Sequence, residues 1–287
     1  MNAVIKLASF HVLTLLLLIS NLTINCKQFA LITSLYNEKN EKRRQEYLFC
    51  LKNNLTHPMI NQVHILYDQS KDTPTNSFCD ILKNIAKQSS NKLTVTKLMG
   101  RPSFSYCFEL ANKKYPDWSI ILCNGDVFFN GTLSALKNYN LTDKLLALTR
   151  WNSAGKGSLN LNWLHDKQGK FRGDWAEFSQ DAWIFDTPIR KIAGDTIMLG
   201  TWNCASLIAY AIGKSGLQIF NPCLTIQCCH LHLTEIRHYV AIQAKGPFLA
   251  LPWCELNNPI IKRDQDDSIT SVKRTIGYPI KTRVAND

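Results

Sequence analysis

Asp126 is the carboxylate whose surroundings most need a chemical explanation. It stands in the stretch ILCNGDVFFNGTL, residues 121–133, between an apolar run that ends at Cys123 and another that begins at Val127. A charge is rarely buried without a partner, so this carboxylate needs a cation, a cluster of donors or a path to the surface. Gly125 would let a ligand approach the backbone. The position favours a divalent cation that holds a diphosphate, with Asp126 as an oxygen ligand of Mg²⁺ or Mn²⁺. The alternative is an Asx-type turn residue.

Two later histidines have a spacing that a metal site could use. His230 and His232 stand in LTIQCCHLH, residues 224–232. Residues i and i+2 of a strand share a face, so both imidazoles could reach one ion, and His is a common metal ligand. Two alternatives stay open: histidines whose protons are satisfied within the core, and a zinc cluster. The cysteines of that cluster would be Cys223, Cys228 and Cys229. Their spacing lacks the paired C-x2-C form of usual structural zinc sites.

Further polar residues adjoin other apolar runs. Asp181 precedes the apolar part of FSQDAWIFD, residues 178–186, a position that suits a general base. The alternative is an Asp that bonds nearby backbone amides. Arg101 and Arg150 follow predicted strands, and either could clamp a phosphate. Trp151 could stack on a sugar ring, although core packing is the commoner use of Trp.

Alternating apolar runs and helical patterns predict how these residues are positioned. The expected strands of the first half are 29–35, 62–68, 92–99 and 118–129, and the expected helices are 40–54, 81–88 and 103–116. Such alternation predicts an α/β fold with a mostly parallel sheet and helices on both of its faces. Ligands of these sheets bind beyond the carboxyl ends of the strands. Asn37, Asp68, Arg101 and Asp126 come at or just after four such ends.

The second half of the chain is less regular. Its expected elements are a strand at 145–152, a long loop at 153–173, the segment 178–186, a helix near 203–214, and the segments 217–222 and 224–232. No organisation is predicted for the polar, basic residues that follow.

Composition limits the class of protein. The chain has 287 residues, 45% of them hydrophobic, which suffices to bury a sizeable core. The net charge of +11 favours anionic ligands, or only a solvated basic surface. The basic residues are scattered and no nucleic-acid-binding motif accompanies them. Some of the ten cysteines could form disulfides if the chain is exported.

The N-terminus carries an apolar run after Lys6. Residues 7–19 form a predominantly apolar run of 13 positions, fewer than the roughly 20 that span a bilayer. The pattern predicts a signal peptide or short signal-anchor over residues 1–26, and hence a membrane-associated or secretory and envelope location. The excess of Lys and Arg after the run weakly favours a cytoplasmic domain if the run is an anchor.

Together these segments resemble the nucleotide-sugar glycosyltransferases of the GT-A fold. FALITSLYN resembles the opening strand and nucleotide-facing turn, and IILCNGDVFFNGTL resembles the strand that carries the DxD motif. SQDAWIF, GTWNCASLIAYAIGKSGLQIFNP and CHLH resemble the acceptor-side strand, the following helix and the C-terminal metal-binding histidine. The resemblance covers residues 29–240. It implies an inverting transfer of a sugar from a nucleotide diphospho-sugar to a hydroxyl of a glycan, lipid or protein.

The resemblance also implies a division of the chain and of its site. The expected parts are a leader at 1–26 and one GT-A-like domain at 27–287, with a nucleotide-binding half at 27–135, an acceptor and metal half at 136–240 and an extension at 241–287. Donor-binding residues would be Ser34, Asn37, Asp68, Arg101, Asn124 and Asp126. Acceptor-binding residues would be Arg150 and Trp151, and the base Asp181. Asp126, His230 and His232 would bind Mn²⁺ or Mg²⁺.

Two departures from the family pattern favour an alternative function. Asn124 stands where the DxD motif has its first acid, and TWNCASL contains no acid where the family commonly has its base. Asp181 or Asp195 would then serve as the base. Otherwise the chain is a weakened or inactive domain that binds glycans or nucleotide sugars.

Overall fold

The computed structural model describes residues 27–72, 78–89, 91–153, 159–160, 177–231, 233–234, 236 and 246–260. The expected leader, His232, most of the loop at 153–173 and most of the C-terminal extension lie outside these ranges. Within them, no helix combines the length and the apolar character that crossing a membrane requires.

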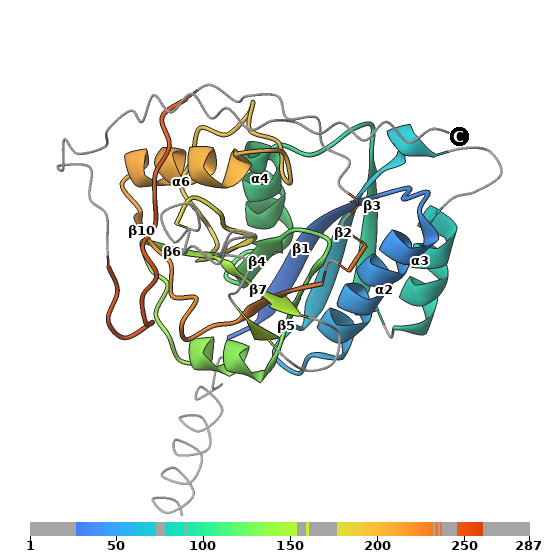
Figure 1. Ribbon diagram of the computed structural model, residues 1–287, viewed down its shortest axis with the longest axis horizontal. Coiled ribbons are helices and arrows are strands. Elements are labelled where there is room, and N and C mark those ends of the chain that lie inside the picture. Colours follow the sequence, from blue (N-terminus) through green and yellow to red (C-terminus); the bar gives the residue numbers. More distant parts are fainter. Residues whose placement is uncertain are drawn as a thin grey trace, which may run out of the picture.

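A seven-stranded sheet forms the centre of the molecule, in the order β10-β6-β9-β4-β1-β2-β3 (Figure 1). Its strands are β1 (Phe29–Tyr36), β2 (Gln62–Asp68), β3 (Leu93–Leu98), β4 (Ser119–Cys123), β6 (Lys144–Leu148), β9 (Ala182–Asp186) and β10 (Gln218–Phe220). Only β9 runs antiparallel to its neighbours β4 and β6. The predicted fold class, a mostly parallel sheet flanked by helices with a smaller mixed part, is confirmed.

A second, four-stranded sheet lies beside the first, in the order β5-β11-β7-β8. Its strands are β5 (Val127–Phe129), β7 (Arg150–Ser153), β8 (Leu159–Asn160) and β11 (Cys228–Leu231). β11 pairs in parallel with β7 and antiparallel with β5. This mixed sheet gathers three segments that are distant in sequence.

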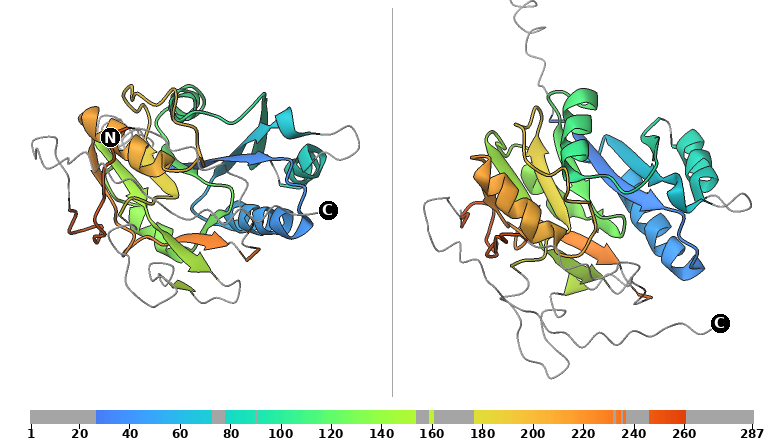
Figure 2. Two further views of the ribbon diagram at one scale, coloured as in Figure 1. Left: turned by 45° about the horizontal axis from the view of Figure 1, so that its top comes forward. Right: turned by 90° about the horizontal axis from the view of Figure 1, so that it is seen from above.

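Helices cover both faces of the central sheet (Figures 1 and 2). They are α2 (Glu41–Thr56), α3 (Phe78–Gln88), α4 (Phe104–Lys114) and α6 (Cys204–Lys214), with short 3-10 turns η1 (Gln69–Lys71) and η2 (Gly131–Leu136). Alternation along β1 supplies both cores, because Phe29 and Leu31 face the cluster under α2 and α3 while Ala30 and Ile32 face the cluster under α4 and α6. Asn40 caps α2, since its side chain accepts the amide of Arg43.

Two expected strands are each divided between the two sheets. The strand predicted at 118–129 breaks at Asn124–Asp126, so β4 stays in the central sheet and β5 pairs with β11. The strand predicted at 145–152 breaks at buried Thr149, whose amide bonds the side chain of Asn221 at 3.1 Å. A polar turn in one case and a side-chain acceptor in the other replace the ladder hydrogen bonds.

Within the described part of the segment 224–232, the strand covers Cys228–Leu231. A turn precedes it, because the amides of Thr225 and Ile226 both donate to the carbonyl of Pro222. The nine cysteines that the structure describes are buried and form no disulfide. Burial raises the pKa of the Cys204 thiol to about 11, so it stays protonated at neutral pH.

Candidate functional site

The candidate site lies at the carboxyl edge of the central sheet, where β4 ends in the turn Asn124–Gly125–Asp126. Because β9 is antiparallel, the residue before it, Asp181, lies at this same edge. The Asn124 amide donates to the Asp181 carbonyl at 3.1 Å, and the Asp181 amide donates to the Leu148 carbonyl at 2.9 Å. The turn therefore joins the ends of β4, β6 and β9 and leads into the second sheet.

Gly125 is needed at this turn because β1 packs directly against it. A Cβ added there would lie 2.4 Å from Leu35 Cδ2 and 3.0 Å from the Ser34 carbonyl oxygen. The space that was expected to admit a ligand is thus filled by the end of β1. Ser34, expected to bind donor, lies beside the turn through its backbone.

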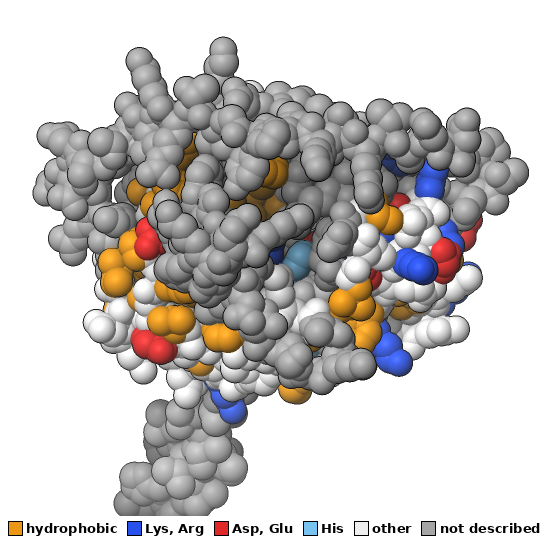
Figure 3. Space-filling model, viewed as in Figure 1, with side chains coloured by type: hydrophobic (Ala, Val, Ile, Leu, Met, Phe, Trp, Pro, Cys, Tyr) orange, Lys and Arg blue, Asp and Glu red, His pale blue; other side chains and the backbone are white. Residues whose placement is uncertain are grey.

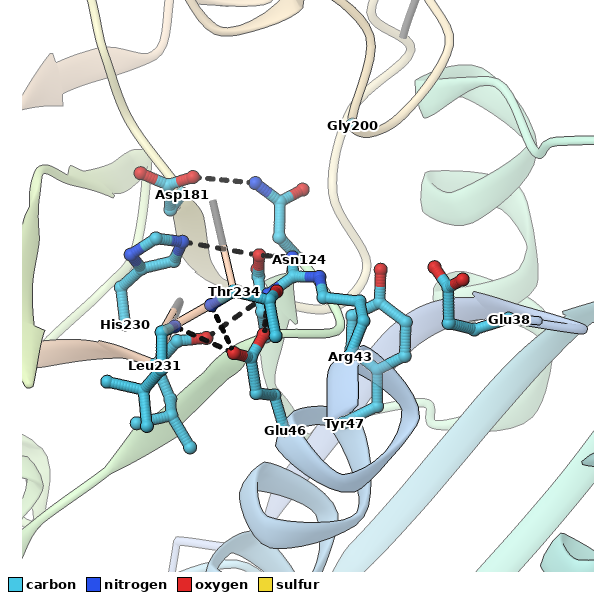
Figure 4. A network of polar contacts seen from close by, with 12 residues as sticks. Glu38, Arg43, Glu46, Tyr47, Asn124, Asp181, Gly200, His230, Leu231 and Thr234 are labelled. Carbon is cyan, nitrogen blue, oxygen red and sulfur yellow. Dashed lines mark hydrogen bonds and ion pairs between the residues drawn. The ribbon is translucent and has the colours of Figure 1, made fainter. Parts of the chain in front are cut away.

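Asp126 is held by a cation and an imidazole. Arg43 of α2 forms an ion pair with Asp126 Oδ2, and His230 Nε2 lies 3.2 Å from the same oxygen (Figure 4). The Asp126 carbonyl accepts the amide of Leu231 at 3.0 Å. One side chain therefore connects α2, the β4–β5 turn and β11, and the partner that the charge requires is present.

Arg43 is only 5% exposed, and its guanidinium has several partners. It forms a second ion pair with Glu46, donates to the Leu231 carbonyl at 3.3 Å and stacks over the Tyr47 ring at 4.7 Å. Burial alone would lower the pKa of Arg43, but the charge of Asp126 and the bonds to both carboxylates raise it. The guanidinium is therefore a permanent charge of this site.

Glu46 and His230 complete the same network. Glu46 Oε1 accepts the amides of Leu233 and Thr234 at 2.7 and 2.9 Å, which fixes the chain after β11. His230 Nδ1 lies 3.1 Å from Asn152 Oδ1 on β7, across the parallel β7–β11 pair. Burial lowers the pKa of His230, although the charge of Asp126 acts in the opposite direction.

Asp181 lies in a second, smaller network. It is 6% exposed; Oδ1 accepts from the Asn124 side-chain amide at 2.7 Å, and Oδ2 pairs with Arg150 Nη1 at 3.1 Å. Asn124 Oδ1 is buried and has no hydrogen-bond partner among the described residues. Asn124 thus links the two acids: its side chain bonds Asp181, and its backbone begins the turn that carries Asp126.

Arg101 is hydrogen-bonded to the backbone of the loop that contains Leu199 and Gly200. Its Nη1 donates to the carbonyls of Leu199 and Gly200 at 3.1 and 2.6 Å, and its side chain is exposed. Gly200 has φ +72°, and a Cβ there would lie 3.0 Å from Arg101 Nη1 and 3.5 Å from Asn124 Oδ1. Arg101 therefore lies at the same part of the edge as Asn124.

Three other predicted residues have local structural partners. Asp68 caps η1 by accepting the Ser70 amide at 3.0 Å, and Asn37 accepts the Phe78 amide at 3.4 Å. Trp151 donates its indole N–H to the Cys223 carbonyl at 2.8 Å. Asn37 and Asp68 lie at the ends of β1 and β2, farther along the edge. The structure thus brings Asn124, Asp126, Arg150, Asp181 and His230 into direct contacts and leaves these three outside them.

Sequence reasoning missed Arg43, Glu46 and Asn152 as members of the site. Arg43 and Glu46 lie in the charged run EKRRQE, which is typical of a solvated helix face. One signal was available: Arg43 and Glu46 share helical spacing with Tyr47, Cys50 and Asn54, all of which are buried. Charged residues on the apolar face of a helix need partners inside the protein.

The predicted metal ligands do not fit a divalent cation in the part of the chain that the structure describes. Within it, no three side chains of His, Cys, Asp or Glu gather as a metal site requires, neither around Asp126 nor around the cysteines of the zinc alternative. Asp126 and His230 are close enough to share an ion, but Arg43 already holds the oxygen that both would use. A divalent cation there would meet a buried positive charge.

On the face seen in Figure 3, described hydrophobic side chains lie on either side of a central area where a histidine is visible.

No family model matches this chain, and no curated protein matches it. Solved structures match at low identity. A mannosyltransferase, PcManGT from Pyrobaculum calidifontis in complex with GDP-Man and Mn²⁺, is 13% identical over 75% of this chain and 59% of its own, with a TM-score of 0.48. S. aureus TarS is 15% identical over 74% and 60%, with a TM-score of 0.38. GalNAc-T7 with UDP, GalNAc and Mn²⁺ is 9% identical over 78% and 46%, with a TM-score of 0.49.

The chain therefore spans between about half and three fifths of the length of these three structures.

Proposed function

We propose that this chain is a glycosyltransferase that moves a sugar from a nucleotide diphospho-sugar to an acceptor hydroxyl. The proposal is supported mainly by one observation: four polar residues lie together at the carboxyl edge of the central sheet, namely Asn124, Asp126, Arg150 and Asp181. Open α/β sheets bind their ligands at this edge. The order of the sequence segments that resemble GT-A enzymes gives the same assignment.

Arg101 is the proposed contact of the donor diphosphate. Its exposed guanidinium bonds two carbonyls and forms no ion pair among the described residues, whereas Arg43 and Arg150 are both paired with acids. A guanidinium that is not neutralised by a carboxylate can bind phosphate oxygens. Ser34, Asn37 and Asp68, at the ends of β1 and β2, are proposed to bind the rest of the nucleotide.

Asp181 is the proposed base of an inverting transfer. As the acceptor oxygen attacks the anomeric carbon, the bond from that carbon to the phosphate oxygen breaks and its electron pair leaves with the nucleoside diphosphate. Asp181 takes the proton of the acceptor hydroxyl. The acceptor hydroxyl would replace one of the two donors that now bond the Asp181 carboxylate. Arg150 and Trp151 are proposed to contact the bound acceptor. No step of this scheme uses a divalent cation, because the described ligands do not fit one.

A second candidate function is a domain that binds nucleotide sugars or glycans without turnover. Both carboxylate oxygens of Asp181 are already bonded. Asp195 is exposed, and the first turn of α6 contains no acid. A site without an available base would bind its ligand and leave it unchanged.

From the resemblance we further propose a glycan, lipid or protein acceptor. From the apolar run near the N-terminus we propose a membrane-associated or secretory location.

A thermal-shift panel of UDP-, GDP- and dTDP-sugars tests the proposed donor. A ligand that binds the native state raises the melting temperature of the full chain, and we expect this for at least one donor. Arg101→Gln should reduce the shift. Arg190→Gln is the matched control, since Arg190 is also exposed and bonds a backbone carbonyl, that of Ser215. A panel with no shift contradicts the proposal, and a shift without any turnover favours the second candidate.

A further inference from the structure

We propose that Arg43 takes the place of a divalent cation in this site, as the fixed counter-charge of Asp126. The site would then bind a nucleoside diphosphate equally well with and without a divalent metal ion. The identity of that ligand rests on the proposed function, whereas the claim about Arg43 and metal rests on the described contacts alone.

Arg43 occupies the oxygen that a metal would need. Asp126 Oδ2 is paired with the Arg43 guanidinium, and His230 Nε2 lies 3.2 Å from that oxygen (Figure 4). Asp126 and His230 are the two predicted metal ligands that the structure describes. A cation that bridged them would have to enter where the guanidinium now meets the carboxylate.

The guanidinium is held too firmly to move aside at little cost. It is paired with Glu46 as well as Asp126, donates to the Leu231 carbonyl and lies over Tyr47. Glu46 is fixed in turn, because its carboxylate accepts the amides of Leu233 and Thr234. Rotating Arg43 away would leave two carboxylates without their cation in a buried site.

Arg43 also connects the elements that an ion at Asp126 would connect. Its contacts join α2, the turn after β4 and the end of β11. It neutralises Asp126, so that this acid does not repel an incoming diphosphate, and leaves the direct phosphate contact to Arg101 at the rim. We therefore describe Arg43 as a positioning residue, not a catalytic one.

Two measurements on the native full chain test the proposal. First, MnCl2 is titrated into the protein while free Mn²⁺ is followed by electron paramagnetic resonance, and we expect the signal to match that of buffer. Second, the affinities of UDP and GDP are measured by calorimetry in EDTA and in Mn²⁺, and we expect them to agree within about twofold. Stoichiometric Mn²⁺ binding, or nucleotide binding that requires Mn²⁺, would overturn the proposal.

Variants at Arg43 sharpen the result. In Arg43→Gln the carboxylates of Asp126 and Glu46 lose their cation, so we expect nucleotide affinity in EDTA to fall about tenfold or more and Mn²⁺ binding to appear. Arg43→Lys keeps the charge but cannot contact Asp126 and Glu46 through two separate nitrogens, so we expect its nucleotide affinity in EDTA to lie between those of Arg43→Gln and the native chain. Arg190→Gln is the surface control. If Arg43→Gln does not fold, the two native measurements still decide. Absence of nucleotide binding in both buffers would contradict the proposed function, while the Mn²⁺ titration alone would still test the claim about metal.

Discussion

Asp126 and Asp181 lie at the same edge of the sheet, and each is paired with an arginine, but the two pairs are built differently. Asp126 shares Arg43 with a buried acid, Glu46, whose other oxygen holds the backbone after β11. Asp181 receives one bond from Arg150 and one from the neutral amide of Asn124. The first network ties three elements together, whereas the second has a neutral donor that an acceptor hydroxyl could replace. This difference supports the proposal that Asp126 maintains the site and that Asp181 is the acid that reacts.

The largest effect is expected from removing the charge of Asp181. Asp181→Asn should lower the rate of transfer by about 10²–10⁴-fold, the usual contribution of a general base, and leave donor affinity nearly unchanged. The rate is measured as release of nucleoside diphosphate from the donor found in the thermal-shift panel.

Asp186→Asn is the control for this prediction, because Asp186 ends the same strand at the opposite edge of the sheet. An Asp181→Asn variant with the native rate would remove Asp181 from the chemistry.

Arg43→Met should cost more stability than any other single change at the site. It leaves buried Glu46 and partly buried Asp126 without their cation, and breaking a buried pair costs about 3–5 kcal/mol. Urea denaturation followed by circular dichroism measures the free energy of unfolding. Arg190→Met removes an exposed pair with Asp143 and should cost at most about 1 kcal/mol. Equal costs for the two variants would mean that the network around Asp126 does not hold the elements together.

Arg150→Met should lower the free energy of unfolding by less than Arg43→Met does. It leaves one carboxylate without its cation instead of two, and that carboxylate keeps the hydrogen bond from Asn124. We expect a loss of about 2–3 kcal/mol in the same denaturation experiment. The order of the two costs is the critical result. If Arg150→Met is the more damaging variant, the roles assigned to the two acids must be exchanged.

The smallest effect should come from the turn between the two acids. Gly125→Ala places a methyl group against Leu35 and the Ser34 carbonyl, and overpacking of this kind costs about 1–2 kcal/mol. Gly131→Ala is the matched control, since nothing lies within 4 Å of its Cβ position. A neutral Gly125→Ala would show that the turn can shift away from β1.

The sequence was sufficient to predict the parallel half of the fold and the edge on which the site lies. The segments 29–35 and 62–68 are apolar and short because these strands are buried on both faces, and polar residues follow each of them. Asp126 and Asp181 stood out for the same reason, as acids beside apolar runs. Their neighbourhood was therefore predictable from local pattern alone.

The pairing within the site was not predictable from local pattern. Arg43 and Asp126 are separated by 83 positions, and Asn124 and Asp181 by 57, so only the folded sheet brings them together. The division of the segments 118–129 and 145–152 between two sheets was missed as well. The break within 145–152 depends on Asn221, a side chain distant in sequence, which replaces a ladder bond at Thr149.

The most direct test of the proposed function is turnover of a nucleotide sugar by the full chain in EDTA, with the nucleoside diphosphate measured by chromatography and the transferred sugar by mass spectrometry. We predict that at least one of the UDP-, GDP- and dTDP-sugars is consumed by the native chain and that Asp181→Asn binds this donor without consuming it. A native chain that neither binds nor consumes any of these donors, in EDTA or in Mn²⁺, would contradict the proposal.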